Sequence, residues 1–220
     1  MPSTASKHPG EIYADLMQVI RIRLDLIKSI KQSAGDDFSR AETAAFHGRK
    51  VIEGIAFACL VATDNSLKAI PRDAKGQWNA ESIFRSLRKK GFDTLPSPSF
   101  VRAPTAEERA ANPPGLSKVY EGIPERRLSH DQLIDIYQSV HPWSHEINPY
   151  TQPDRQQFYV RHETKLWDDL EKLDRFLERH VISIAREGFF CVLRDSRDGM
   201  TKVSSISRPP GWTPPAAPSP

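Results

Sequence analysis

The sequence predicts a mainly α-helical protein, an antiparallel helical bundle with a small C-terminal β-hairpin. Apolar residues recur at three- and four-residue steps over most of the chain, which is the spacing of helices that bury one face. Only the stretch from Phe189 to Ile206 has two short β-rich runs around a glycine-containing turn. A length of 220 residues suits one core, so we expect a single domain over residues 11–207. Residues 1–10 are expected to form a disordered lead, and residues 208–220 a proline-rich disordered tail.

The first helix is expected from Glu11 to about Gln32, and the chain should leave it by Gly35. Its apolar residues recur at steps of three and four, which predicts an amphipathic helix. The members of this repeat are Ile12, Leu16, Val19, Arg23, Leu26 or Ile27, and Ile30.

The second helix is expected to open with a capping box, in which Ser39 and Glu42 each bond the other's backbone amide. From Val51 to Ala62 nearly every residue is apolar around the whole circumference, which predicts a helix packed on several sides. The polar residues of this helix include His47, Arg49, Lys50 and Glu53. Because burying an unpaired charge is costly, Arg49 and Glu53, one turn apart, should pair or face a polar pocket.

Two further helices are marked by their caps. Asn79 is a good N-cap for a short helix that Gly91 ends, and Ser129 with Gln132 forms a second capping box for a helix through Val140. Between these helices prolines and polar residues dominate, so residues 95–124 are expected to form a long surface loop with a turn around residues 106–111.

The longest helix is expected from about Asp154 to Arg186, where leucines and other apolar residues form one stripe that Gly188 ends. The β-hairpin follows, with strands at residues 189–193 and 201–206 around a five-residue loop. Because a two-stranded hairpin is marginal alone, it should pack on the helices, join other strands or pair across a dimer.

Composition narrows the class of protein. No apolar run approaches the length of about 20 residues that spans a bilayer, and the N-terminus lacks the apolar core of a signal peptide, so we expect a cytoplasmic protein without membrane contact. Cys59 and Cys191 are the two cysteines, and both are expected in the core. A net charge of +3 is compatible with RNA contact without requiring it. We expect no cofactor and no metal.

The densest polar and aromatic stretch runs from Val140 to Tyr150 and lies between two helices. His141 and His145 are four residues apart, a spacing that suits a metal on a regular helix, but Pro142 disfavours such a helix. Two other interpretations stay open. In one, Trp143 packs into the core while the histidines bond nearby carbonyls; in the other, the aromatic and basic residues offer stacking surfaces to RNA.

Four features together resemble a bacterial helical family without an assigned activity. They are Arg49-Lys50-x-Ile52-Glu53 on a buried helix, Trp78-Asn79 opening the next helix, the Pro-x-Pro of Pro96 and Pro98, and the turn His145-x-x-Asn148-Pro149. The resemblance spans residues 41–149, and its layout is similar to the HEPN superfamily of helical domains. The resemblance implies one of two roles. Many such domains are dimeric, metal-independent ribonucleases of toxin, phage-defence or RNA-processing systems, with an arginine followed after four to six residues by a histidine; others are inactive binding modules.

Three pairs in this chain have that motif's spacing: Arg40 and His47, Arg155 and His162, and Arg175 and His180. Metal-independent RNA cleavage needs a base for the 2′-hydroxyl and a cation for the developing phosphorane. His47 or His145 together with Arg49 would supply both. His162 and His180 are expected to be core or boundary residues.

Two hypotheses follow for the candidate site residues His47, Arg49, Glu53, His145 and Asn148. In the first, the chain is a HEPN-like interaction or regulatory domain of a bacterial defence or stress system, and its polar cluster is architectural. In the second, the chain is a metal-independent endoribonuclease. RNA, a protein partner and a second copy in a homodimer are the partners that these hypotheses allow.

Overall fold

The structure is a computed structural model that describes residues 7–64, 78–92, 94–111, 116–145, 154–184 and 187–206. Most of these residues are helical, as predicted, and the described α-helices are α1 (Pro9–Gln32), α2 (Asp37–Asp64), α4 (Ala80–Lys89), α5 (Ala106–Ala111), α6 (His130–Val140) and α7 (Arg155–Leu177). The lead at residues 1–6 and the tail from residue 207 lie outside the described residues. The helix α1 begins at Pro9, earlier than predicted, because His8 caps it through its side chain.

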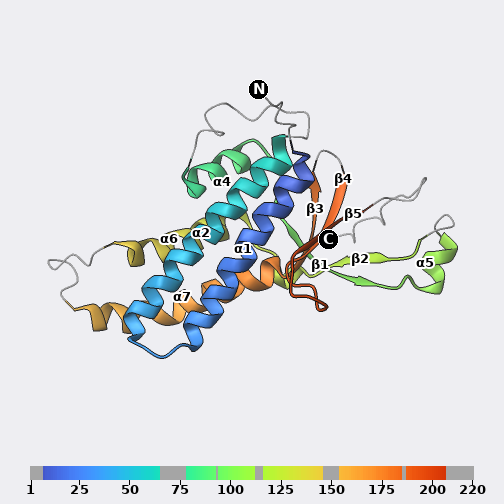
Figure 1. Cartoon of the computed structure of the whole chain (residues 1–220). Coiled ribbons are helices and arrows are strands. Elements are labelled where there is room, and N and C mark those ends of the chain that lie inside the picture. Colours follow the sequence, from blue (N-terminus) through green and yellow to red (C-terminus); the bar gives the residue numbers. More distant parts are fainter. Residues whose placement is uncertain are drawn as a thin grey trace, which may run out of the picture.

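Helix α2 lies at the centre of the helical part and contacts α1, α4, α6 and α7 as well as strand β3 (Arg179–Ile184) (Figure 1). Its residues from Val51 to Ala62 are largely buried around the circumference, which confirms the prediction of a helix packed on several sides. Close approach depends on a small residue at Gly48, where a Cβ atom would lie 2.3 Å from Leu170 of α7.

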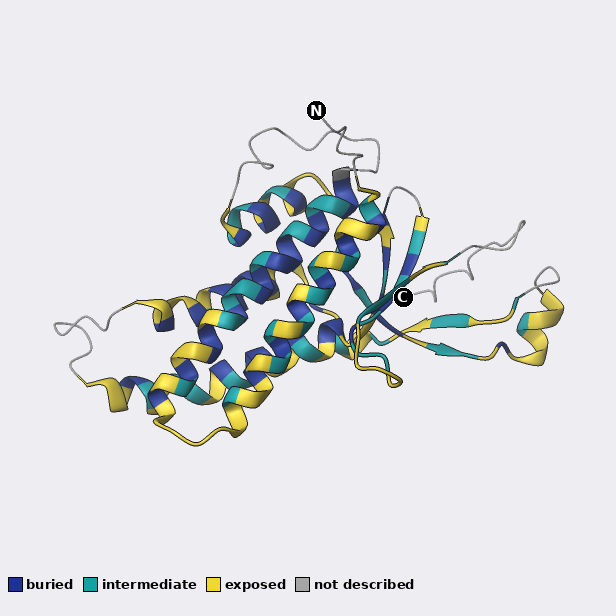
Figure 2. Cartoon of the chain, in the orientation of Figure 1, coloured by how far each residue is buried: buried dark blue, intermediate teal, exposed yellow. Residues whose placement is uncertain are grey.

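The buried face of α1 coincides only in part with the apolar repeat expected from the sequence. The residues of α1 that pack on the core are Gly10, Tyr13, Met17, Ile20, Leu24 and Ile27. Of the predicted repeat, Leu16, Ile27 and Ile30 pack on the core, whereas Ile12, Val19 and Leu26 are exposed together with Ile22 (Figure 2). Neighbouring residues of a helix lie about 100° apart, so the predicted repeat mixes residues of the buried side with residues of the exposed side. We call Ile12, Val19, Ile22 and Leu26 the outer stripe of α1.

The start of α2 also differs from its prediction. The helix begins at Asp37, and Ser39 lies inside the first turn. The backbone amide and the hydroxyl of Ser39 donate to Oδ2 of Asp36, at 2.8 and 2.9 Å. Asp36 is therefore the capping residue, because a carboxylate at that position accepts from the third amide of the helix.

The other two predicted caps are confirmed. Asn79 accepts from the amide of Ser82 at the start of α4, and Gly91 adopts a φ of 68° just after its end. Ser129 and Gln132 form the reciprocal capping box of α6. A short 3₁₀ helix, η2 (His141–Ser144), follows α6 directly and carries the buried Trp143.

Helix α7 is shorter than predicted. Asp154 caps it as expected, but it ends at Leu177, and the residues expected to continue it form strand β3. His180, Ile182 and Ile184 are the buried residues of β3, which is the alternation of a strand with one face on a core. The β-branched run in this segment favours a strand, and pairing with β4 (Glu187–Val192) completes it.

The hairpin predicted at residues 189–206 is present, but it is only part of a larger sheet. Strand β4 pairs antiparallel with β5 (Lys202–Ile206). The sheet has five strands in the order β2-β1-β3-β4-β5, so of the three surroundings expected for the hairpin, the one in which it joins other strands is confirmed.

The expected loop at residues 95–124 contains two of these strands, β1 (Ser97–Arg102) and β2 (Val119–Gly122), with α5 between them. Strand β1 pairs with β3 only at Ser97 and Pro98, and then with β2 over residues 99–102. The ribbon of β1, α5 and β2 therefore leaves the sheet and extends away from the helices (Figure 1). Strand β2 is the edge of the sheet, and Pro98 of β1 lies where that strand changes its partner from β3 to β2, so its missing amide proton is tolerated there.

Helices and sheet share one hydrophobic cluster, and charged side chains join them at its border. The guanidinium of Arg194, which follows β4, donates to Asp25 of α1 at 2.6 Å and also contacts Asp174 of α7 at 2.8 Å. Both cysteines, Cys59 and Cys191, are buried in the core as predicted.

Candidate functional site

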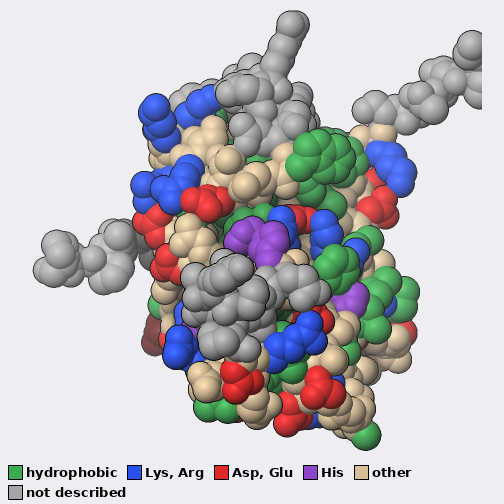
Figure 3. All heavy atoms as spheres, turned by 90° about the vertical axis from the view of Figure 1, so that its left-hand side faces the viewer, with side chains coloured by type: hydrophobic (Ala, Val, Ile, Leu, Met, Phe, Trp, Pro, Cys, Tyr) green, Lys and Arg blue, Asp and Glu red, His purple; other side chains and the backbone are tan. Residues whose placement is uncertain are grey.

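Several of the predicted site residues meet where α2, α6 and η2 come together. We call this group the polar cluster; it consists of Arg49, Lys50 and Glu53 from α2, Tyr137 from α6, and His141 and His145 at the two ends of η2. Figure 3 shows the corresponding side of the molecule, where histidine side chains lie beside lysine, arginine and acidic side chains near its middle. Asn148 lies outside the described residues.

Arg49 and Glu53 pair with each other, as one branch of the prediction required. The Nε of Arg49 donates to Oε1 of Glu53 at 3.1 Å, and Nζ of Lys50 donates to Oε2 at 2.7 Å. The Glu53 side chain is only 12% exposed, against 29% for Arg49. Each carboxylate oxygen therefore has a cation as its partner, and with two cations against one carboxylate this turn of α2 keeps a net positive charge.

Arg49 also reaches the other elements of the cluster. Its guanidinium carbon lies 5.5 Å from the ring centre of Tyr137, a cation–π distance. Burial lowers the pKa of His141, and the neighbouring His145 and Arg49 lower it further, while Glu81 of α4 acts in the opposite direction. Arg49 and His141 are thus close enough to influence each other's charge.

The two histidines are in direct contact. Their Nε2 atoms lie 3.2 Å apart, and the ring centres are 4.5 Å apart with an edge-to-face orientation. One ring must donate its Nε2 proton while the other accepts through a lone pair, so at least one imidazole is neutral. Both residues are exposed, and a ligand from solvent can therefore compete for the same nitrogen atoms.

His47 does not belong to this cluster. Its Nδ1 lies 3.2 Å from a guanidinium nitrogen of Arg23 on α1. Burial lowers its pKa, and the charge of Arg23 adds to that effect. Because His47 and Arg49 are two residues apart, they lie on different sides of α2, and the structure does not bring them to one site.

A third histidine forms a separate buried centre. His180 of β3 and Tyr13 of α1 are both fully buried, with 2.6 Å between Nε2 and the tyrosine hydroxyl. The other ring nitrogen, Nδ1, lies 3.0 Å from the carbonyl of Leu177 and donates to it. Burial lowers the pKa of His180 to about 4 and raises that of Tyr13, so both groups are neutral near pH 7. The expectation that His180 is a satisfied core residue is confirmed.

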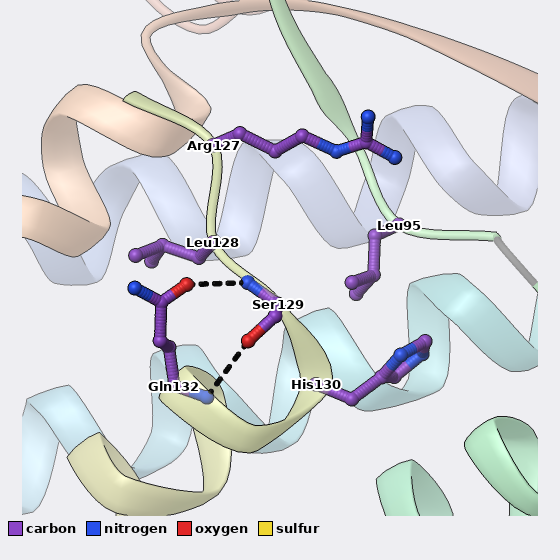
Figure 4. Close-up of a pocket in the computed structure, with 6 residues that line it drawn as sticks. All are labelled: Leu95, Arg127, Leu128, Ser129, His130 and Gln132. Atoms are coloured by element: carbon purple, nitrogen blue, oxygen red, sulfur yellow. Dashed lines mark hydrogen bonds between the residues drawn. The ribbon is translucent and has the colours of Figure 1, made fainter. Parts of the chain in front are cut away.

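A pocket of about 370 Å³ opens at the start of α6, and its lining residues are Leu95, Arg127, Leu128, Ser129, His130 and Gln132 (Figure 4). The capping box forms one wall, where the amide of Ser129 donates to Gln132 at 2.8 Å and the amide of Gln132 donates to Ser129 at 3.2 Å. These polar atoms already have partners in the helix cap. The pocket shares no residue with the polar cluster.

Sequence reasoning missed part of the cluster. Tyr137 carries no signal of its own, since it is an ordinary member of an amphipathic helix, and only the packing of α2 against α6 brings it near Arg49. His141 was considered as a metal ligand, as a partner of nearby carbonyls and as part of an RNA-contacting loop, but not as a neighbour of Arg49. Within the described residues, no group of three or more His, Cys, Asp or Glu side chains is arranged to hold a metal ion.

Comparison with protein-family models, with curated proteins and with solved structures finds no match to this chain. Among the helices that the structure describes, none combines the length and apolarity needed to cross a bilayer.

Proposed function

We propose that this protein is a cytoplasmic, HEPN-like helical interaction or regulatory domain of a bacterial defence or stress system, with its helices arranged as an antiparallel bundle. The observation that carries the proposal is the closed ion pairing of Glu53. Arg49 and Lys50 occupy both of its carboxylate oxygens, and the carboxylate is largely buried. A charged group held in this way stabilises the packing of α2 and is poorly placed to exchange protons with a substrate.

The exposed part of the polar cluster supplies the contact surface in this proposal. His141 and His145 face solvent beside the half-buried Arg49. Imidazole and guanidinium groups offer several hydrogen-bond donors to a partner. The pairing of Arg49 with Glu53 below them keeps its guanidinium in one position, so the surface is ordered before a partner binds.

The second candidate function is metal-independent RNA cleavage, and one contact favours it. The Nε2 atoms of His141 and His145 face each other at 3.2 Å, and Arg49 lies close enough to lower the pKa of His141. A neutral histidine can accept the proton of a 2′-hydroxyl, a protonated one can donate to the leaving oxygen, and an arginine can stabilise the phosphorane. In this version His141 takes the place that His47 had in the sequence-based hypothesis.

The two functions are separated by incubating total bacterial RNA with the purified protein in excess chelator. The variants are His141→Ala and His145→Ala, and His162→Ala on α7 is the matched control outside the cluster. If the wild type and the control degrade the RNA, and either cluster variant does not although its melting temperature is unchanged, the protein is a ribonuclease that uses the polar cluster. Intact RNA with every protein supports the interaction domain. Degradation that persists in both cluster variants contradicts the cluster as the site of cleavage.

A further inference from the structure

The polar cluster contains an arginine whose outer end is unused. Nε of Arg49 donates to Glu53 at 3.1 Å, and the central carbon of its guanidinium lies 5.5 Å from the ring centre of Tyr137. Within the described residues, no hydrogen bond or ion pair engages the two terminal nitrogens of this guanidinium. They form a fork of donors that is held from two sides, and such a fork takes two oxygen atoms of one anion.

The two histidines lie beside this fork. His141 follows α6 in helical conformation, with φ −60° and ψ −45°, so it extends the side of α6 on which Tyr137 lies one turn earlier. Helix α2 also contacts η2 directly. The Nε2 atoms of His141 and His145 are 3.2 Å apart, and both side chains are exposed. An anion held by Arg49 is therefore within reach of an imidazole donor.

The charge of the cluster favours an anion. Arg49 and Lys50 stand against a single carboxylate, that of Glu53. The Lys50 side chain is 40% exposed and uses one of its three donors on Glu53. Glu81 of α4, an acidic neighbour of the cluster, is neutralised by Arg85 one turn along its own helix. A compact anion is therefore attracted to this surface.

The number of donors selects a phosphoryl group over a carboxylate. The fork of Arg49 binds two oxygen atoms, and both oxygens of a carboxylate would be used there. A phosphate monoester has three terminal oxygens and a charge of about −1.5 to −2 at pH 7. Its third oxygen can accept from the histidine pair on η2, which approaches from a different element than Arg49.

The aromatic residues of the site argue against a nucleic acid. RNA is bound through aromatic side chains on which its bases stack. Apart from histidine, α6 and η2 carry Tyr137 and Trp143, which are only 5% and 1% exposed, so bases cannot stack on them. A strand also needs a row of cations, whereas this side of the molecule has acidic side chains among the basic ones (Figure 3). One phosphoryl group on a protein fits this surface better.

We propose that the polar cluster binds the phosphoryl group of a phosphorylated side chain on a partner protein, with Arg49 holding two of its oxygens and the histidine pair the third. Arginine side chains recognise phosphorylated segments in other interaction domains. Each histidine Nε2 can then carry a proton and donate to the anion instead of to the other ring. This inference rests on the interaction domain proposed above, since it names the group that the domain recognises.

The test follows the histidine ring signals of the full-length protein by NMR at pH 7 and constant ionic strength. N-acetyl-phosphoserine amide should shift the signals of His141 and His145, with a dissociation constant in roughly the millimolar range. Acetate and dimethyl phosphate each have two free oxygens and one charge, so both should bind at least about tenfold more weakly. Inorganic phosphate and adenosine 5′-monophosphate present the same group from other sources.

Variants assign the donors. Arg49→Lys keeps a cation beside Glu53 but loses the fork, so phosphoserine binding should weaken about tenfold. Its matched control is Arg175→Lys on α7, where the arginine also pairs with a glutamate of its own helix, and binding should be unchanged. His141→Gln and His145→Gln should each weaken binding about threefold to tenfold, with His162→Gln as the control. If Arg49→Lys lowers the melting temperature, the variants of the exposed histidines decide.

Several outcomes overturn the proposal. Phosphoserine may shift no histidine signal, or binding may survive the Arg49 and histidine variants, or the control variants may weaken it equally. Acetate that binds as tightly as phosphoserine would make the ligand a carboxylate. Tighter binding of dimethyl phosphate would point to RNA, and tighter binding of adenosine 5′-monophosphate to a nucleotide. RNA degradation contradicts the interaction domain whatever phosphoserine does, whereas intact RNA without phosphoserine binding contradicts only this inference.

Discussion

Two histidine contacts in this protein differ in their surroundings. His180 with Tyr13 is enclosed between α1 and β3, whereas His141 with His145 lies on the surface at the end of α6. In the first, every ring nitrogen of His180 has a protein partner. In the second, the rings have each other and solvent. The surroundings of a histidine therefore decide whether it supports the fold or is available to a ligand.

The largest effect on stability is expected from His180→Ala. The change leaves a cavity and removes the partner of the buried Tyr13 hydroxyl, so the free energy of unfolding should fall by about 3–5 kcal/mol. Urea unfolding measures it. Tyr13→Phe keeps the ring and removes only the hydroxyl, so a smaller loss of about 1–3 kcal/mol is expected. Equal losses for the two variants would show that the hydrogen bond, and not the packing of the imidazole, dominates.

The buried centre should also make stability depend on pH. The pKa of His180 is lowered from 6.5 to about 4 by burial, so between these values the unfolded chain binds a proton that the folded chain does not. The free energy of unfolding should therefore fall by about 3 kcal/mol as the pH drops from 6.5 to 4, and this contribution should be constant below pH 4.

The control for this prediction is His180→Gln, which keeps a polar side chain but does not titrate. Urea unfolding of both proteins at several pH values gives the two slopes. A variant whose stability falls as steeply as that of the wild type would place the pH dependence in other groups, such as His47 and His141, whose pKa values are also lowered by burial.

Removing the half-buried ion pair of Glu53 should have an intermediate effect on the free energy of unfolding. Glu53→Ala removes the partner of Arg49 and Lys50, but both cations keep access to water, so a loss of about 1 kcal/mol is expected. A double-mutant cycle with Arg49→Ala isolates the pair. A coupling energy near zero between Glu53 and Arg49 would contradict the architectural role proposed for this pair.

The smallest effect on stability is expected at the exposed contact. His141→Ala and His145→Ala should change the free energy of unfolding by no more than about 0.5 kcal/mol, because solvent replaces the lost partner. Thermal melts at pH 7 measure this. A loss above about 2 kcal/mol would place these residues with His180 as structural, and would remove them as candidates for ligand contact.

The helices were predictable where local chemistry marks their ends. Asn79 and Ser129 cap α4 and α6 as expected, because their side chains bond the first turn whatever the rest of the chain does. Strands β1 and β2 were not predictable, since their sequence is polar and rich in proline and they exist through pairing with each other and, at two residues, with β3. Pairing across distant segments leaves little trace in a local pattern.

The face of α1 shows a second limit of local patterns. Its core-facing residues and its outer stripe have the same spacing and similar apolar content. Only the position of α2 decides which of them is buried. The prediction that α7 continues through residues 179–184 was wrong for a related reason. Val181 and Ile184 fit the apolar stripe of a helix, but His180, Ile182 and Ile184 fit the buried face of a strand.

In the candidate site, the pairing of Arg49 with Glu53 was predictable because both lie on one helix, one turn apart. The approach of His141 to Arg49 was not, because it depends on how η2 turns at the end of α6. The sequence-based pairing of His47 with Arg49 failed since neighbours in sequence point to different sides of a helix.

The contacts that join α1 to the sheet also constrain how the protein folds. Tyr13 bonds a residue 167 positions later, and Asp25 bonds one 169 positions later. During synthesis α1 and α2, which pack on each other, leave the ribosome long before β3 and β4, so Tyr13 and Asp25 lack their partners until those strands arrive. Contacts of such long sequence separation slow folding. We therefore expect the last steps of folding to be the docking of the sheet onto a helix made at the start.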